Sequence, residues 1–374
     1  MQWDLAPACT DYDVVVIGGG PAGSATALSL LQSGIESVLL IEANRFEKQR
    51  VGESLIPDVR RCFNQLDMDY DFLDSCHMQS PGNSSSWGQD SLGYSDFLCH
   101  PLGNGWHIDR CAFDRHLVKE AVSRGVEVCT ACRYQSYTEA ESGGGLQLTL
   151  QTEEGTQNIG AKFVVDATGL SSRFARHKGA VRKITDKLTV TYGYFSVPTD
   201  SKLSKQTLLE ACEYGWWYRS RLPDNRMIAA LSCDTSYFRD HRLRNWQCWL
   251  EHLASTRYIS TGLAESRFDP GTLSATPAVT GQLWPQCGVN WAAVGDAACS
   301  IDPILGVGIY KSLNDGIDAG SAIAGALRGD RQALSNWQVN SVQAYKGYLQ
   351  QHQYLYALEQ RWPLSIFWRR RQAV

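Results

Sequence analysis

Gly18, Gly20 and Gly23 have the spacing of a turn that can hold a phosphate group. They follow an apolar run at residues 14–17 and precede an alanine-rich segment. In this context the first glycine permits a tight turn, the second lets backbone N–H groups approach a pyrophosphate, and the third lets a helix pack on a sheet. A pyrophosphate would rest on the helix N-terminus, where unpaired N–H groups and the dipole favour negative charge. The pattern predicts a dinucleotide-binding turn.

Glu42 follows a second apolar run, about 20 residues beyond the glycines, where a ribose-binding carboxylate is expected. An acidic side chain there would repel a 2′-phosphate, so the predicted nucleotide is FAD or NAD. The predicted nucleotide site also includes Ala43 and Arg45, directly after this strand.

Two later segments carry small and acidic residues after predicted strands. Residues 160–165 lead into a polar turn with Thr168 and Gly169, and residues 291–294 lead into Gly295 and Asp296. A carboxylate at a strand end can accept hydrogen bonds from several ribityl hydroxyls, although Asp296 could also cap the following helix. The nucleotide domain is therefore expected to come from three separate parts of the chain.

Composition excludes several classes of protein. A net charge of −4 and 20% charged residues give no electrostatic case for nucleic acid binding. The longest apolar runs have the length of strands, so we expect no membrane span, no signal peptide and a cytoplasmic location. The twelve cysteines are scattered and are expected to be reduced. Cys129 and Cys132 have redox or zinc spacing but lack a second ligand pair, and no metal site is predicted.

Several elements follow from local patterns. Helices are expected at residues 58–72, 240–254 and 309–327, and a further helix is expected to open at Asp109 or Arg110 and to end at Gly125. A hairpin is expected to join residues 216–222 to 227–231, and residues 80–87 are expected to form a loop. The aromatic residues of the C-terminal region have helical spacing, which favours core packing over a docking surface.

The three nucleotide segments resemble, in order and character, the fingerprints of FAD-dependent monooxygenases of the single-component aromatic hydroxylase type and of the related flavin halogenases. The resemblance implies that Glu42 holds the adenosine ribose, Arg110 lies near FAD and Asp296 binds the ribityl chain. It also implies that Pro303, Gly306 and Gly308 lie beside the isoalloxazine. There glycine would allow close backbone approach, and the next helix N-terminus would stabilise negative charge on the reduced ring.

The expected fold class is α/β, with a Rossmann-like FAD-binding domain, a substrate domain with a mostly antiparallel sheet, and a C-terminal helical region. The FAD-binding domain is assigned to residues 1–79, 100–180 and 281–330, the substrate domain to residues 80–99 and 181–280, and the helical region to residues 331–374. No second glycine-rich fingerprint is present. NAD(P)H is therefore expected to reduce the flavin transiently, or a reductase supplies the electrons, and O₂ then provides one oxygen atom.

Halogenation is the nearest alternative, because residues 52–57 resemble the corresponding halogenase loop. The halogenase lysine should follow that loop, yet no lysine occurs between Lys48 and Lys119. The two tryptophans of the halogenase motif would align with Tyr218 and Ser220. These departures favour hydroxylation.

The segments at residues 52–54, 215–218 and 359–370 look most like the flavoproteins encoded beside amino-acid oxidases that carry cysteine tryptophylquinone. That resemblance implies a protein substrate, a tryptophan side chain of a precursor oxidase. A small-molecule hydroxylase, a reductase resembling geranylgeranyl reductases, and a non-catalytic assembly partner remain alternatives.

The sequence offers few residues for catalysis itself. Glu53 could orient the substrate or cap a turn. His107 could approach the pocket, although its neighbours also suit a packed structural histidine. Together with Pro303, Gly306 and Gly308, these are the predicted catalytic residues.

Overall fold

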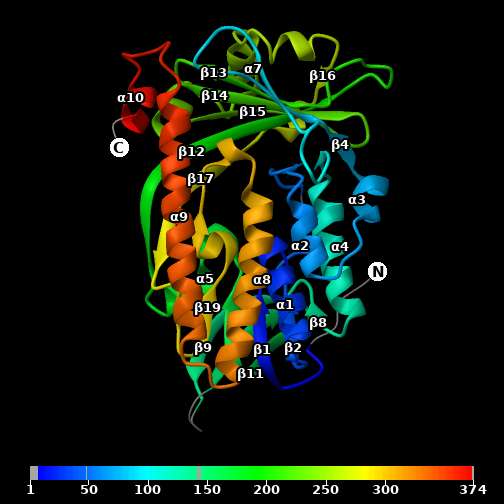
Figure 1. Cartoon of the computed structure of the whole chain (residues 1–374), viewed down its shortest axis with the longest axis vertical. Coiled ribbons are helices and arrows are strands. Elements are labelled where there is room, and N and C mark those ends of the chain that lie inside the picture. The colour runs from blue at the N-terminus through cyan, green and yellow to red at the C-terminus, as the bar shows by residue number, and fades with distance from the viewer. Residues whose placement is uncertain (1–6, 48, 141–144, 373–374) are drawn as a thin grey trace.

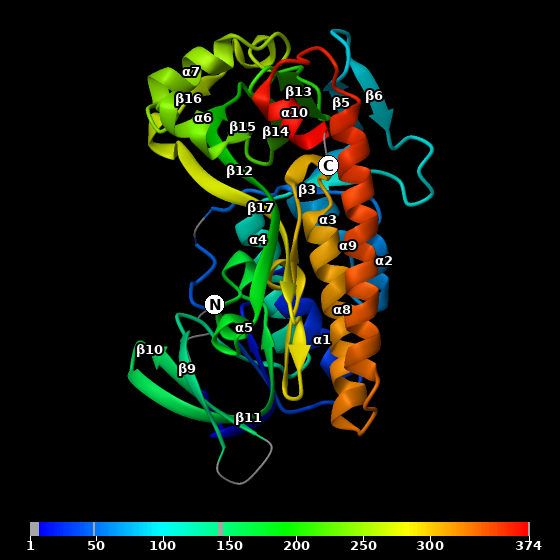
Figure 2. The same ribbon diagram turned by 90° about the vertical axis from the view of Figure 1, so that its left-hand side faces the viewer.

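The computed structural model describes residues 7–47, 49–140 and 145–372. Within these residues, one sheet of eight strands and one of nine strands lie towards opposite ends of an elongated molecule (Figure 1). The long helices α8 (Gly308–Leu327) and α9 (Ala333–Ala357) run beside each other along its length (Figure 2). The predicted α/β class is confirmed.

The eight-stranded sheet has a parallel centre. Its main strand order is β18-β19-β11-β1-β2-β8, and β9 and β10 extend β11 as an antiparallel hairpin. Three distant parts of the chain therefore share one sheet, as the sequence predicts. The strands are β1 (Asp11–Ile17), β2 (Val38–Ile41), β8 (Glu127–Cys129), β9 (Arg133–Glu139), β10 (Leu146–Thr152), β11 (Gly155–Asp166), β18 (Cys287–Gly288) and β19 (Trp291–Ala293).

Strand β1 shows how both faces of this sheet are buried. Val14 and Val16 pack on the side of the helices, whereas Val15 and Ile17 pack on the side of β9 and β10. Successive strand residues point to opposite faces, so a continuous apolar run identifies a strand covered on both sides. Because both faces are buried, the strands are held in place, and the polar turns that follow β1, β11 and β19 extend from their ends.

Helices cover the two sheets and join them. Gly316 and Gly320 of α8 let this helix approach α1 closely, since an added Cβ would lie 2.4 Å from the Ala22 carbonyl oxygen and 2.6 Å from Ser29 Cβ. The remaining helices are α1 (Pro21–Gln32), α2 (Val59–Gln65), α3 (Asp71–Cys76), α4 (Arg110–Ser123), α5 (Arg173–His177), α6 (Thr235–Asp240), α7 (Trp246–Ala254) and α10 (Ile366–Gln372).

The nine-stranded sheet is mostly antiparallel, with the main order β20-β17-β12-β15-β14-β13-β5-β6 and β16 paired to β12. The predicted hairpin is confirmed as β14 and β15, and Asp224 and Asn225 take positive φ values of 62° and 54° in its turn. The strands are β5 (Gly82–Ser86), β6 (Gly93–Asp96), β12 (Val181–Ser196), β13 (Thr207–Cys212), β14 (Gly215–Leu222), β15 (Arg226–Asp234), β16 (Arg267–Phe268), β17 (Ser274–Trp284) and β20 (Cys299–Ser300). A small third sheet has β3 (Ser54–Leu55), β4 (Met78–Ser80) and β7 (Gly105–His107).

Three local predictions are wrong. The helix expected at residues 58–72 ends at Gln65, because Asp67 takes a φ of +50° and breaks it. The loop expected at residues 80–87 contains β5, whose serine-rich sequence hides a strand that pairs with β13 and β6. The helix expected from residue 240 begins at Trp246, where Asn245 accepts hydrogen bonds from the N–H groups of the first turn.

Other local predictions hold. Helix α4 has Asp109 as its N-cap, and its side chain accepts from the Ala112 N–H. Most of the C-terminal aromatic side chains are buried, as core packing predicts, whereas Tyr354 is 64% exposed. All twelve cysteines are thiols. Every helix in the described part of the chain is too short or too polar to cross a membrane. The domain boundaries stay predictions.

Candidate functional site

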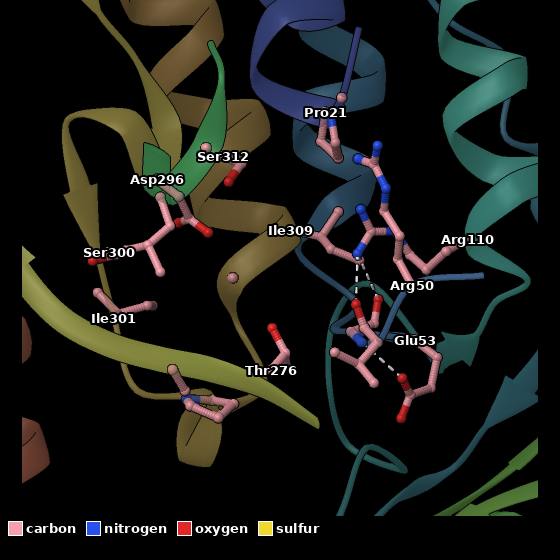
Figure 3. Close-up of a pocket in the computed structure, with 18 of the residues that line it drawn as sticks. Pro21, Arg50, Glu53, Arg110, Thr276, Asp296, Ser300, Ile301, Ile309 and Ser312 are labelled. Carbon is pink, nitrogen blue, oxygen red and sulfur yellow. Dashed lines mark hydrogen bonds between the residues drawn. The ribbon is translucent and has the colours of Figure 1, made fainter. Parts of the chain in front are cut away.

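A cavity of about 890 Å³ lies where the carboxyl ends of the parallel strands meet the nine-stranded sheet. Ligand sites in proteins commonly have this volume, and in open α/β sheets they lie at the carboxyl ends of the strands. Figure 3 shows Asp296 and Ser300 on one side of the cavity and Arg110 and Glu53 on the other. The cavity therefore draws on both sheets and on segments far apart in the sequence.

The glycine turn forms one end of this cavity, and its three glycines have different roles. Gly18 has a φ of +113°, and an added Cβ would lie 2.4 Å from the Ala167 carbonyl oxygen. At Gly23 the Cβ would lie 1.9 Å from the Gly18 carbonyl oxygen, whereas at Gly20 it would meet nothing within 4 Å. Gly18 and Gly20 line the cavity and Gly23 does not. The turn and the helix contact thus require Gly18 and Gly23, and Gly20 leaves space at the N-terminus of α1.

Glu42 is buried beside this turn. Its Oε2 accepts from the Gly19 N–H at 2.9 Å, and its Oε1 accepts from the backbone N–H and the side-chain amide of Asn44, both at 3.0 Å. Glu42 and Ala43 line the cavity. Arg45 instead forms an ion pair with Glu153 at 2.6 Å and is not among the described lining residues. A nucleotide contact from Arg45 would require this pair to open.

The second polar turn depends on Asp166, which the sequence analysis did not select. Asp166 is fully buried and accepts from the Thr168 N–H and hydroxyl at 2.9 and 2.7 Å and from the Ala175 N–H at 2.8 Å. Burial raises its pKa, and these hydrogen bonds oppose that shift. The carboxylate holds Thr168 and Gly169 at the cavity wall. Its position at the end of an apolar strand was the available signal.

Asp296 is the acidic residue of the third turn, and its side chain is 48% exposed. It lines the cavity, and its Oδ1 lies 3.5 Å from Lys311 Nζ. Its predicted alternative as a cap of the next helix is wrong, because α8 begins after Val307 without a side-chain cap. Gly295 is not among the lining residues, and its N–H donates to Asp315 at 2.6 Å.

Pro303, Gly306 and Gly308 line the cavity at the N-terminus of α8. Gly306 takes a φ of +64°, and a Cβ at Gly306 or Gly308 would meet nothing within 4 Å. Asp302 shapes the start of this turn, since its Oδ1 accepts from the Ile304 N–H at 2.9 Å. The turn therefore presents main chain and a helix N-terminus to the cavity.

Arg110 and Glu53 form the opposite wall (Figure 3). Arg110 pairs with Asp114 at 3.2 Å and donates to the carbonyl oxygens of Val51 and Gly52 at 3.0 and 3.2 Å. Glu53 is 4% exposed and accepts from the Gly52 N–H at 2.8 Å. Burial raises the pKa of Glu53, and hydrogen bonding to Tyr218 opposes the shift. A carboxylate kept in such surroundings is typical of a functional site.

His107 lies on the same side and is 1% exposed. Its Nε2 is hydrogen-bonded to the Thr207 hydroxyl at 2.8 Å. Burial lowers its pKa to about 4, so the imidazole is neutral near pH 7. His107 can accept or donate a hydrogen bond at the cavity but holds no charge there.

Aromatic rings enclose the end of the cavity away from the glycine turn. They come from the nine-stranded sheet and from the segments that border it, and the sequence did not select them as site residues. The lining rings are Trp87, Phe97, Trp106, Tyr192, Trp216 and Tyr218. No lysine occurs among the described residues that line the cavity.

The residues present fit FAD. The space at Gly20 and the N-terminus of α1 suit a pyrophosphate, and the Glu42 carboxylate suits a ribose hydroxyl. Asp296 offers exposed oxygens at the cavity wall, and the open turn at Gly306 and Gly308 suits a flat ring. One cavity thus brings together the acceptors and the glycine spaces that a dinucleotide requires.

Comparison with known proteins agrees with this fit. A family model described as an FAD binding domain matches residues 11–252. LodB of Marinomonas mediterranea, named as an FAD-dependent oxidoreductase, is 30% identical over 363 residues, which are 97% of this chain and 97% of that protein.

Two solved structures share the fold. The flavin-dependent halogenase CmlS superposes with a TM-score of 0.84 and 24% identity, covering 97% of this chain and 68% of that chain. The peptidyl tryptophan dihydroxylase QhpG, essential for tryptophylquinone cofactor biogenesis, superposes with a TM-score of 0.76 and 23% identity, covering 97% of this chain and 79% of that chain. The chain thus belongs to the FAD-binding domain family and is an FAD-dependent oxidoreductase.

Proposed function

We propose that this flavoprotein is a monooxygenase that hydroxylates a tryptophan side chain of a precursor oxidase during the formation of a tryptophylquinone cofactor. NAD(P)H or a reductase would supply two electrons, and O₂ would supply one oxygen atom to the tryptophan and leave the other as water. The observation that carries this proposal is the buried Glu53 carboxylate in a cavity whose far end is lined by aromatic rings.

An indole suits this end of the cavity. It is a flat apolar ring with a single N–H donor, so it needs ring contacts and one acceptor. Trp216 and Tyr218 offer the ring contacts, and Glu53 offers a carboxylate whose other contacts come from Gly52 and Tyr218. A hydrogen bond from the indole N–H to the Glu53 carboxylate would orient the indole. It would also raise the electron density at the ring carbon that is attacked.

The other side chains hold the site in place. Arg110 fixes the loop that carries Glu53 through the Val51 and Gly52 carbonyls. The neutral His107 supports Thr207 at the cavity wall. When bound, FAD supplies the activation of O₂, and the N-terminus of α8 stabilises negative charge beside the turn at residues 303–306. The aromatic walls exclude water from the reacting atoms.

The fold neighbours support the proposal without deciding the substrate. QhpG acts on a peptidyl tryptophan by its name, and the present chain shares its fold over 97% of its length. The resemblance of residues 52–54, 215–218 and 359–370 to tryptophylquinone-associated flavoproteins points the same way. A phenol or indole as a free small molecule, or an alkene reduced without O₂, is the alternative use of the same cavity.

Halogenation is the second candidate, favoured by the likeness to CmlS and by the loop at residues 52–57. A halogenase of the lysine type needs an amine near the substrate to capture hypohalous acid. The described lining residues offer arginines and carboxylates instead. Hydroxylation is therefore the better match to this cavity.

The test is mass spectrometry of an oxidase encoded beside this gene, co-expressed with and without the flavoprotein. The proposal expects oxygen added to one tryptophan of the oxidase only when the flavoprotein is present. Gly306→Val should still bind the oxidase but should abolish the modification. Modification that persists with Gly306→Val would support the assembly-partner alternative, a halogen on the ring would support the halogenase, and an unchanged tryptophan would rule out the protein substrate.

A further inference from the structure

Three side chains of α9 converge on Asp302, the residue that begins the turn at residues 303–306. Tyr348, His352 and Tyr356 are four residues apart and therefore lie on one face of this helix. The Tyr356 hydroxyl donates to Asp302 Oδ2 at 2.8 Å, and His352 Nε2 lies 3.2 Å from the same oxygen. The Asp302 N–H donates to the Tyr348 hydroxyl at 2.7 Å.

The contacts continue to the aromatic wall of the cavity. Trp216 Nε1 donates to the Tyr356 hydroxyl at 3.0 Å, and Trp216 lines the cavity. On the other side, Asp302 Oδ1 accepts from the Ile304 N–H inside the turn. A hydrogen-bonded path thus runs from the wall at Trp216 through Tyr356 and Asp302 into the turn.

The polar groups of this path are buried, so each hydrogen bond contributes to the stability of the fold. Trp216, Tyr356 and Asp302 are each at most 1% exposed. Loss of one partner would leave a buried polar group unsatisfied, which destabilises the protein because water cannot replace the lost contact. The Tyr356 hydroxyl is therefore held in one orientation by a donor on one side and an acceptor on the other.

A metal site is the alternative explanation of this cluster. Asp186, Asp302 and His352 have ligand-type atoms within 4.8 Å of one another. Arg371 already pairs with both oxygens of Asp186, at 2.7 and 2.9 Å. A guanidinium at that place repels a cation, so the contacts favour a hydrogen-bonded network.

We infer that Tyr356 is a positioning residue that holds the turn at residues 303–306 in register with the aromatic wall at Trp216. This inference rests on the proposal that the turn faces the isoalloxazine of bound FAD. It goes beyond that proposal by giving α9, a helix outside both sheets, a role in the geometry between flavin and substrate. A substrate that contacts Trp216 would therefore also affect the position of the turn, through the hydrogen bonds from Trp216 to Tyr356 and from Tyr356 to Asp302.

The test compares Tyr356→Phe with Tyr345→Phe in the FAD-loaded protein. Tyr345 is a matched control, because it is a buried tyrosine of the same helix whose hydroxyl lies 3.2 Å from Thr185 Oγ1, whereas the Asp302 carboxylate contacts His352 and Tyr356. We measure the FAD dissociation constant, the visible circular dichroism of the bound flavin and the thermal midpoint. Tyr356→Phe should weaken FAD binding about threefold to tenfold and change the flavin dichroism. Tyr345→Phe should lower the thermal midpoint by about as much as Tyr356→Phe does, and it should leave FAD binding and the flavin dichroism unchanged.

Equal flavin readouts in the two variants would overturn the inference. If Tyr356→Phe does not fold, Tyr348→Phe carries the same test, since it removes the acceptor of the Asp302 N–H. Gly306→Val distinguishes the role of Tyr356 from the placement of the turn at the flavin. A changed dichroism in Gly306→Val with an unchanged one in Tyr356→Phe would reject the role of Tyr356 alone. No change in either would reject the placement of the turn at the flavin, whatever the substrate.

Discussion

In the turn that forms one end of the cavity and in the helix that follows it, Gly18, Gly20 and Gly23 act by having no side chain. At the other end, Trp216 and Tyr218 enclose the space with rings. The glycine end depends on main-chain geometry within a short segment. The aromatic end depends on side chains that come together only in the folded protein. The two ends should therefore respond differently to substitution. A side chain added at the glycine end should prevent folding or FAD binding, whereas a change at the aromatic end should lower the reaction rate.

The largest effect is expected at Gly23. In Gly23→Val the new Cβ would lie 1.9 Å from the Gly18 carbonyl oxygen, which neither backbone can accommodate. We expect loss of the native fold or a destabilisation of more than about 3 kcal/mol, a cost reserved for severe steric conflict. Urea unfolding of the purified protein measures it. A stable Gly23→Val protein would contradict the assigned close contact of α1 with the turn that follows β1.

Gly20→Val sharpens the comparison, because the same substitution at Gly20 meets nothing within 4 Å. Gly20 also has a φ of −76°, which any residue adopts. We expect the apoprotein to unfold at nearly the wild-type temperature, while FAD binding weakens by about a hundredfold or more as the side chain fills the pyrophosphate space. Fluorescence titration with FAD measures the binding. If Gly20→Val bound FAD with wild-type affinity, the pyrophosphate would have to bind at a place other than Gly20.

Glu53→Gln tests the aromatic end, where the proposed role is to orient the substrate. FAD binding should be retained, and the rate of tryptophan modification should fall about tenfold to a hundredfold, as expected for a lost charged hydrogen bond. Single-turnover assays with reduced enzyme measure this rate. A parallel loss of FAD would place Glu53 in the nucleotide site instead.

The same variant should change how stability depends on pH. Burial raises the pKa of Glu53 above its usual 4.5, so the folded state holds the proton more tightly than the unfolded state. Stability from this group is present below 4.5 and is lost as pH rises through the raised pKa. Glu53→Gln should therefore gain stability relative to wild type at pH 8 and not at pH 4. Unfolding free energies of the apoprotein at both pH values measure the difference, and an equal effect at both would contradict the shift.

His107 should give the smallest effect, visible only in acid. Its pKa is lowered to about 4, so its contribution to stability is lost as pH falls from about 6.5 towards 4. His107→Gln should reduce the loss of stability between pH 7 and pH 5, and substitution of the exposed His241 serves as the control. An unaltered slope would mean that His107 is not held neutral by burial.

The same contrast explains what could be predicted from the sequence. The parallel strands, the glycine turn and Glu42 follow from local patterns, because apolar runs and small residues at strand ends carry the information within a few positions. The strand β5 was missed because serines have little strand preference and its pairing with β13 and β6 stabilises it only in the folded protein. The break at Asp67 was missed because the helical spacing continues past it.

Site residues divide along the same line. Asp166 and Asp302 act on turns beside them and had a local signal, an acid at a strand end and an acid before Pro303. The helical spacing of Tyr348, His352 and Tyr356 was also visible in the sequence. Their common partner Asp302 was not, because α9 meets Asp302 only in the folded protein. Trp216 and Tyr218 of the aromatic wall lie in the segment at residues 215–218 that carries part of the family resemblance, although no local pattern marked their rings as lining a cavity.

The central claim is that one cavity holds FAD at the glycine end and a target tryptophan at the aromatic end. The most direct measurement quantifies bound FAD and oxygen on the oxidase tryptophan in the same co-expressed preparations of wild type, Gly20→Val and Glu53→Gln. We expect both signals in wild type, neither in Gly20→Val, and FAD with little oxygen insertion in Glu53→Gln. Full FAD content in Gly20→Val, or undiminished oxygen insertion in Glu53→Gln, would contradict it.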